Sequence, residues 1–253
     1  VFRSFQAELE NVFEEYNMYL DDNSTHTRNF IFGKLYEGHA YARDIIGYPE
    51  DLKNPKMRQL IDFYNTWYVP NNMALILVGD FDTEAAKPLI EKTFGKLQAR
   101  PLPQRTQYPT TAFSQDERYS AKLGYMPELY IAYNGVPVGD KDELLLDFLG
   151  EILSNSMPIG LLDELTLDNK LMYAGAANDV RRDQGRFLVI AVPYMDAETQ
   201  TYTSLKETEQ LVNEVIQQLV SGNISEELVE AVRQNFYQEF DRTMEYPEMK
   251  VQL

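Results

Sequence analysis

The 253-residue sequence contains no cysteine and only two histidines, and its basic residues are scarce beside its acidic ones. The lack of cysteine excludes disulfide bonds and cysteine-based zinc sites. Because 23 Lys and Arg stand against 40 Asp and Glu, the formal net charge is −17. Clustered positive charge of the kind that binds nucleic acid or an anionic membrane surface is therefore not expected. No apolar run approaches about 18 residues, so no transmembrane segment is predicted.

What is present is the composition of an ordinary folded protein, with 44% apolar and 25% charged residues. Apolar residues at helical spacing predict helices over 2–20, 25–36, 55–67, 141–153, 159–167, 202–220 and 225–245. Short apolar or alternating runs predict strands over 73–78, 118–123, 129–136, 171–180 and 186–193. The last two strands should pair as a hairpin, because the residues between them include glycine and polar side chains. Three prolines within residues 100–109 indicate a linker.

The stretch from Phe63 to Asp82, FYNTWYVPNNMALILVGDFD, is the most informative part of the sequence. A helix should end near Trp67, because Pro70 cannot continue helical hydrogen bonding. The apolar run MALILV then predicts a strand buried on both faces, and Asp82 or Thr83 can cap the helix that follows. This order of helix, YVPNNM, strand, GDFD and helix resembles the same segment of the pitrilysin/insulinase family of zinc peptidases, the inverzincins.

The first predicted helix carries four glutamates beside an apolar stripe, and the stripe predicts that this helix packs on a core. Glu8 and Glu15 are seven residues apart, so they share one face of the helix at the edge of the stripe. On spacing alone, both are ordinary solvent-exposed glutamates. The stripe consists of Phe5, Leu9, Val12, Phe13, Tyr16 and Leu20.

The family resemblance implies a more specific role for these two glutamates. In the family, a Glu-x6-Glu pattern followed by a short acidic stretch lies downstream of a His-x-x-Glu-His helix. The segment ELENVFEEYNMYLDD matches that pattern here. The resemblance therefore implies that Glu15 is a zinc ligand of the intact protein and that Glu8 helps to orient the site.

The sequence lacks the rest of such a zinc site. The His-x-x-Glu-His motif, which supplies two ligands and the general base in the family, does not occur. His39 lies in a loop that the family shares and is interpreted as a surface or hydrogen-bonding histidine. His26 has even less to indicate a role in a metal or catalytic site. A catalytic zinc needs three protein ligands and a water with a base nearby. The chain by itself is therefore expected to be inactive, with no catalytic residue of its own.

The family also carries an Arg-x6-Tyr pair that binds substrate near the zinc. LDELTLDNKLMYAG aligns with this place, with Tyr173 at the tyrosine but Thr166 at the arginine. Either the chain belongs to a long, four-domain member whose functional pair lies in the last domain, or this copy is degenerate. Tyr173 is a possible substrate-binding residue, although a buried core tyrosine is the favoured interpretation. Arg181 and Arg182 are interpreted as surface charges at the tip of the hairpin.

The resemblance implies an α+β fold of two related domains, each a mostly antiparallel sheet covered by helices, which together form half of a clamshell. Residues 1–99 would be the C-terminal part of the first, zinc-site domain. Residues 100–112 would be a proline-rich linker, and residues 113–253 a second, homologous domain truncated at its C-terminus. The chain is therefore expected to be a piece of a longer protein.

The implied function is that of a zinc-dependent metalloendopeptidase of which this chain is one part. The intact protein would use Zn2+ to hydrolyse peptides or unfolded polypeptides inside a closed chamber. Expected partners are peptide substrates and the remaining domains of the parent chain or a partner subunit, and likeness to bacterial members favours a periplasmic location. The alternative, which Thr166 fits, is a non-catalytic scaffold or peptide-binding half of a pitrilysin-like assembly. A His-x-x-Glu-His motif upstream of this chain would favour the enzyme.

Overall fold

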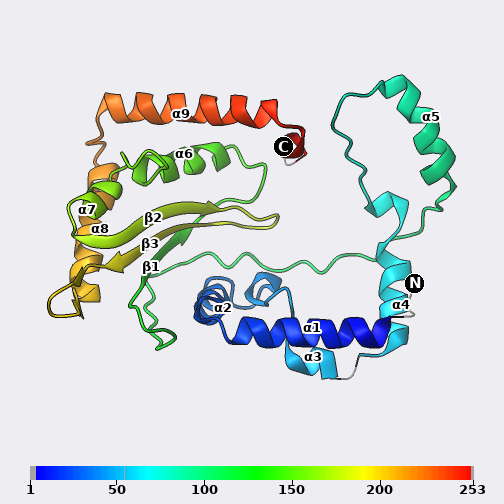
Figure 1. Cartoon of the computed structure of the whole chain (residues 1–253), viewed down its shortest axis with the longest axis horizontal. Coiled ribbons are helices and arrows are strands. Elements are labelled where there is room, and N and C mark those ends of the chain that lie inside the picture. Colours follow the sequence, from blue (N-terminus) through cyan, green and yellow to red (C-terminus); the bar gives the residue numbers. More distant parts are fainter. Residues whose placement is uncertain (1–3, 54, 252–253) are drawn as a thin grey trace. The chain divides into compact units, whose positions relative to one another are not determined.

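The computed structural model describes residues 4–53 and 55–251 (Figure 1). These residues form two compact units. The first unit takes in the described parts of 1–22, 44–108 and 238–253, and the second takes in 23–43 and 109–237. The chain thus leaves the second unit after residue 43 and returns to it at residue 109. Among the described residues, no helix combines the length and the apolar character needed to cross a membrane.

The first unit is built from helices and irregular segments. Of the two predicted caps, Asp82 begins helix α5 (Thr83–Thr93), because its carboxylate accepts hydrogen bonds from the backbone N–H groups of Glu84 (2.8 Å) and Ala85 (3.2 Å). The helices predicted over 2–20 and 55–67 are confirmed as α1 and α4. The elements are α1 (Phe5–Leu20), α3 (Pro49–Lys53), α4 (Met57–Trp67), η2 (Pro70–Asn72), α5 (Thr83–Thr93), η3 (Phe94–Lys96) and α10 (Pro247–Lys250).

The second unit combines helices with antiparallel strands, so the predicted α+β class is confirmed. The helices predicted in this half are present, although α7 begins at Asp163 rather than at residue 159. The elements are α2 (Asn23–Leu35), η1 (Ala40–Ala42), β1 (Leu129–Asn134), α6 (Glu143–Leu153), α7 (Asp163–Leu167), β2 (Leu171–Asp179), β3 (Arg186–Pro193), β4 (Met195–Asp196), β5 (Thr201–Tyr202), α8 (Leu205–Val220) and most of α9 (Glu226–Glu245).

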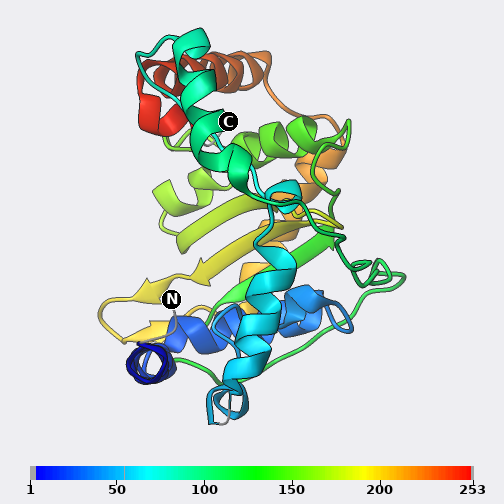
Figure 2. The same cartoon turned by 90° about the vertical axis from the view of Figure 1, so that its right-hand side faces the viewer.

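The central sheet of the second unit has the strand order β1-β3-β2, with antiparallel pairing throughout. The predicted hairpin is confirmed, since Asp179 of β2 pairs with Arg186 of β3 at the turn. Both views show α6 on one side of this sheet and α2 on the other (Figure 1, Figure 2). Side chains alternate between the two faces along each strand, so each face has its own packing partners.

The face of the sheet toward α6 carries the main hydrophobic core. Val189 and Ala191 of β3 pack there with Leu162, with Val212 of α8 and with Val232 of α9, and none of these five is more than 1% exposed. The predicted strands and helices of this half therefore form because they bury one another's apolar faces.

The opposite face of the sheet is covered in part by the end of α2. Leu188 of β3 and Ala132 of β1 pack there with Leu35 and Tyr36. Tyr36 is fully buried, and its hydroxyl donates a hydrogen bond of 2.7 Å to Asp179 Oδ2. The segment 23–43 is thereby attached to a sheet made by residues far along the chain.

Two predicted strands are wrong. Residues 73–78 and 118–123 are all described, yet neither segment forms a strand. The apolar run from Met73 to Val78 is exposed throughout, with Ile76 62% exposed. Extended chain becomes a strand only when its N–H and C=O groups find a neighbour, and neither segment lies in a pairing with another described residue.

The exposure of residues 73–78 predicts a small mutational effect. We expect Ile76→Ala to change the free energy of unfolding of this chain by less than about 0.5 kcal/mol, as for other exposed positions. Ile152→Ala in α6 is the matched control, because Ile152 is 1% exposed in the main core and its truncation should cost about 2–5 kcal/mol. Urea denaturation measures both. A loss at Ile76 as large as that at Ile152 would contradict the exposed placement.

Helix α1 is less buried than its apolar stripe predicts. Among its residues, Phe5, Leu9, Val12 and Tyr16 are half-buried, and Phe13 is 37% exposed. None of the residues of α1 is fully buried. Leu20, the last residue of the stripe, is 41% exposed. The predicted packing of α1 on a core is therefore not found, since the described residues cover the stripe only in part.

Candidate functional site

Glu8 and Glu15 lie on α1 in the first unit, and both are exposed. Their seven-residue spacing places them on the same side of the helix, two turns apart. The Glu15 carboxylate accepts a 3.2 Å hydrogen bond from the hydroxyl of Tyr19, one turn further along the helix. Glu15 is thus presented on the surface of α1, where its carboxylate is accessible to further donors or to a metal.

The described residues do not make a metal site on their own, since no group of three or more of their His, Asp or Glu side chains is placed to hold an ion. His39 is buried in the second unit, and its Nδ1 accepts a 3.2 Å hydrogen bond from the backbone N–H of Tyr41. The predicted hydrogen-bonding role of His39 is confirmed, whereas its alternative placement on the surface is wrong. The described residues alone therefore do not fit a catalytic zinc ion.

Tyr173 lies on β2 in the second unit and is 53% exposed, so the buried core placement favoured for it is wrong. Its ring lies over Gly175, because a Cβ built at Gly175 would stand only 2.6 Å from the Tyr173 hydroxyl oxygen. Gly175 faces Ile190 of β3, which in turn faces Tyr130 of β1. Tyr173 therefore occupies the face of the sheet that α2 covers only in part.

Thr166, at the position of the family's arginine, lies in the short helix α7. It is half-buried, and its backbone carbonyl accepts a hydrogen bond of 3.1 Å from the N–H of Asn169. A threonine has neither the reach nor the charge of an arginine, so this position cannot supply a cation beside Tyr173.

The arginines near the hairpin differ from one another in placement. Arg182 is a surface charge, as predicted. Arg181 is not, because its Nε donates a 2.8 Å hydrogen bond to Asp179 and its guanidinium lies 4.6 to 5.2 Å from the centroids of three aromatic rings. Packing against Phe32, Tyr36 and Tyr41 in this way is typical of a structural arginine.

Arg186 is buried still more deeply, at 2% exposure. Its guanidinium donates hydrogen bonds to the carbonyl of Leu35 (2.9 Å), to Thr111 Oγ1 (2.9 Å) and to the Thr111 carbonyl. It also lies between the rings of Tyr36 and Phe113, at 5.1 and 4.4 Å from their centroids. Burial lowers the pKa of Arg186, but a guanidinium in this network stays charged.

Sequence reasoning missed two polar residues on the face of the sheet that carries Tyr173. The Tyr130 hydroxyl donates a 2.9 Å hydrogen bond to Glu128 Oε2. Burial, together with this hydrogen bond, raises the pKa of Tyr130. The alternation in ELYIAYN was the available signal, because residues 128, 130 and 132 must share one face of an extended segment.

Comparison with known families gives one match over most of the chain. Residues 56–236 match the family described as the peptidase M16 inactive domain. A curated relative, the zinc protease PqqE of Helicobacter pylori, is 24% identical over 169 residues. That alignment covers 64% of this chain but 37% of the relative, so the chain spans only part of the protein that it resembles.

Solved structures give the same fold. A protease from Helicobacter pylori has a TM-score of 0.77 at 19% identity, over 97% of this chain and 59% of that one. The periplasmic protease PqqL of Escherichia coli has a TM-score of 0.75 at 18% identity, over 100% of this chain and 29% of that one. At such low identity, these likenesses concern the fold alone.

Proposed function

This chain belongs to the M16 family of peptidases, and we propose that it is one part of a zinc-dependent metalloendopeptidase that hydrolyses peptides or unfolded polypeptides. The observation that carries the proposal is the Glu-x6-Glu pattern of Glu8 and Glu15, displayed on one accessible side of α1. In a member of this family, that pattern is expected beside a zinc site. The zinc protease relative supports a peptidase, and the match of residues 56–236 to an inactive domain supports a chain without a complete catalytic centre.

In this proposal the chain contributes surfaces and one ligand, and no complete catalytic centre. Glu15 would provide a carboxylate ligand for zinc, and Glu8 would orient the site. The histidine ligands and the general base come from outside this chain. The chain is therefore inactive by itself and works with the remaining domains of its parent protein, or with a partner subunit, as half of a clamshell.

Tyr173 has a separate role in this proposal. Its exposed position on β2 allows it to contact a peptide held against the sheet. The domain division proposed from the sequence, at residues 100–112, would place Tyr173 in the second domain and Glu15 in the first. A periplasmic location is part of the proposal, because the similar protease PqqL of Escherichia coli is periplasmic.

The test is zinc binding by the full-length protein, compared with its Glu15→Gln variant. We expect about one zinc per wild-type chain and at least tenfold weaker binding in Glu15→Gln, because an amide oxygen is a much poorer ligand than a carboxylate. Glu14→Gln is the matched control, since Glu14 is also an exposed glutamate of α1 and should leave zinc binding unchanged. Dialysis followed by metal analysis gives the stoichiometry.

Two outcomes would decide against the proposal. Equal zinc loss in Glu14→Gln and Glu15→Gln would mean a general effect of helix charge. No zinc in the folded wild-type protein would favour the second candidate function, a non-catalytic scaffold or peptide-binding half. Thr166 is the observation that favours this second candidate, because it leaves Tyr173 without the arginine that accompanies it in the family's substrate site.

A further inference from the structure

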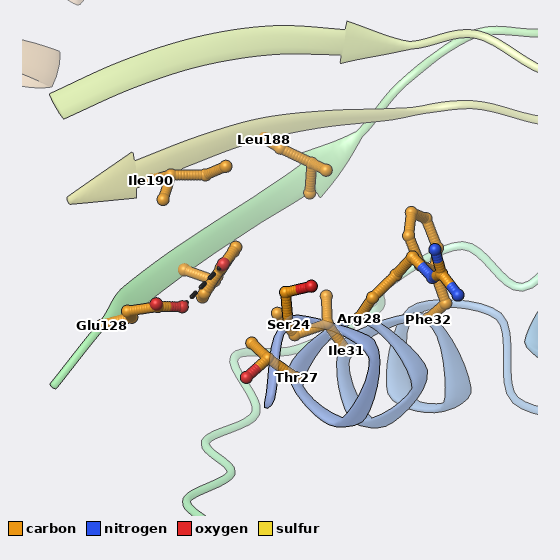
Figure 3. A pocket seen from close by; sticks show the side chains of 9 residues that line it. Ser24, Thr27, Arg28, Ile31, Phe32, Glu128, Leu188 and Ile190 are labelled. Carbon is orange, nitrogen blue, oxygen red and sulfur yellow. Dashed lines mark hydrogen bonds between the residues drawn. The ribbon is translucent and has the colours of Figure 1, made fainter. Parts of the chain in front are cut away.

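An open cavity of about 220 Å³ lies between α2 and the sheet face that carries Tyr173 (Figure 3). Its apolar wall consists of Ile31 and Phe32 from α2 and Leu188 and Ile190 from β3. Small-molecule and cofactor sites usually enclose about 300–1,000 Å³. The cavity is therefore of a size for one long side chain rather than for a cofactor.

A carboxylate lies at one end of this cavity. Glu128 immediately precedes β1 and is half-buried. The Tyr130 hydroxyl donates its 2.9 Å hydrogen bond to Oε2 only, so Oε1 keeps acceptor capacity for a ligand. The hydrogen bond fixes the direction of the carboxylate, and less side-chain freedom is then lost when a ligand binds.

The positive charge in the lining lies away from this carboxylate. Figure 3 shows Arg28 beside Phe32, at the opposite end of the cavity from Glu128. Arg28 therefore does not neutralise Glu128 by direct contact. The net charge of −17 adds a long-range attraction for cations.

We propose that this cavity binds a lysine or arginine side chain of a peptide, with the aliphatic stem on Ile31, Leu188 and Ile190 and the cationic group on Glu128. Long basic side chains bind in this manner elsewhere, since their methylene stems cover apolar surface while their charged ends find polar partners. The pocket adjoins Tyr173 through Ile190 and Gly175. The inference rests on the proposed function in that it names a preference among peptide ligands, and binding can be measured without zinc or cleavage.

The experiment measures the binding of two fluorescently labelled peptides to the full-length protein. Both have acetylated N-termini and five residues, with lysine at the centre of one and norleucine at the centre of the other. Norleucine keeps the apolar stem and lacks the ammonium group. We expect the lysine peptide to bind about tenfold more tightly, a difference of about 1.4 kcal/mol. A third peptide, with norleucine at the centre and a free N-terminus, separates a side-chain cation from a terminal amine.

Variants assign the preference to the pocket. Glu128→Gln should abolish the preference for lysine over norleucine, because it removes the charge without changing the shape. Glu198→Gln removes one charge at an exposed position in the β4–β5 loop and should keep the preference. Ile190→Trp should fill the cavity and weaken the binding of both acetylated peptides.

The proposal is overturned if the two acetylated peptides bind equally to the wild-type protein, or if Glu198→Gln lowers the preference as much as Glu128→Gln does. It is also overturned if only the peptide with a free N-terminus binds tightly. Retention of zinc by Glu128→Gln separates this test from the test of Glu15. A failure here then leaves the peptidase proposal standing, whereas loss of zinc in Glu15→Gln does not alter the lysine preference that this test measures.

Discussion

Replacing Arg186 with alanine is expected to destabilise the protein by about 3–5 kcal/mol. Arg186 is 2% exposed, and its guanidinium donates hydrogen bonds to Leu35 and Thr111 while lying between two aromatic rings. Alanine would leave buried acceptors without donors, at about 1–3 kcal/mol each, and would open a cavity between Tyr36 and Phe113. Urea denaturation followed by circular dichroism measures the change.

Two further variants separate the causes of that loss. Arg182→Ala, at an exposed position of the same hairpin, should lie within about 0.5 kcal/mol of wild type. Arg186→Lys keeps the charge but loses the planar fork that reaches several acceptors at once, so its stability should fall between those of wild type and Arg186→Ala. A loss below about 1 kcal/mol in Arg186→Ala would show that this network contributes little to stability.

Gly185→Ala is also expected to destabilise the protein strongly, by about 3 kcal/mol. A Cβ at this position would clash with the Val136 carbonyl oxygen and would stand 2.9 Å from the Asp179 carbonyl oxygen. Both obstacles are backbone atoms, which cannot move aside as a flexible side chain does. The close approach is also seen in the 3.1 Å hydrogen bond from the Gly135 N–H to the Gly185 carbonyl.

The control for Gly185→Ala is a glycine-to-alanine substitution that should have the opposite effect on stability. Gly33 lies inside α2, and a Cβ there would meet no atom within 4 Å other than those of its chain neighbours and the helix's own backbone. Alanine in a helix interior is better than glycine by about 0.5–1 kcal/mol, so Gly33→Ala should stabilise the protein. Thermal unfolding of the two variants should shift in opposite directions, and a neutral Gly185→Ala would mean that the hairpin opens to accept a methyl group.

The secondary structure was predictable wherever a segment pairs or packs with a segment close to it in the sequence. The alternation in LMYAGAAND and the run RFLVIAVP correctly predicted β2 and β3, because each strand pairs with the other a few residues away. The run MALILV has stronger strand propensity, yet it is exposed coil. Strand propensity and hydrophobic pattern are properties of one segment. A strand also needs a second strand to pair with, and the local sequence does not identify that partner.

The polar residues were harder to predict than the fold. Arg181, expected on the surface, is half-buried, and Tyr173, expected in the core, is exposed. Arg186 lies at the start of an apolar run, which indicates that its guanidinium is buried and hydrogen-bonded. Its acceptors at Leu35 and Thr111 are 151 and 75 residues away in sequence, and no pattern within the strand points to them.

The second unit is built from two segments far apart in the sequence, 23–43 and 109–237. This arrangement has a consequence for synthesis on the ribosome. The hydrogen bond from Arg186 to Leu35 joins residues 151 positions apart. At about 5–20 residues per second, roughly 8–30 s pass between the synthesis of α2 and the emergence of β3. During that interval Leu35 and Tyr36 lack the sheet that buries them. The nascent chain thus presents an apolar helix end to chaperones until translation has passed the hairpin.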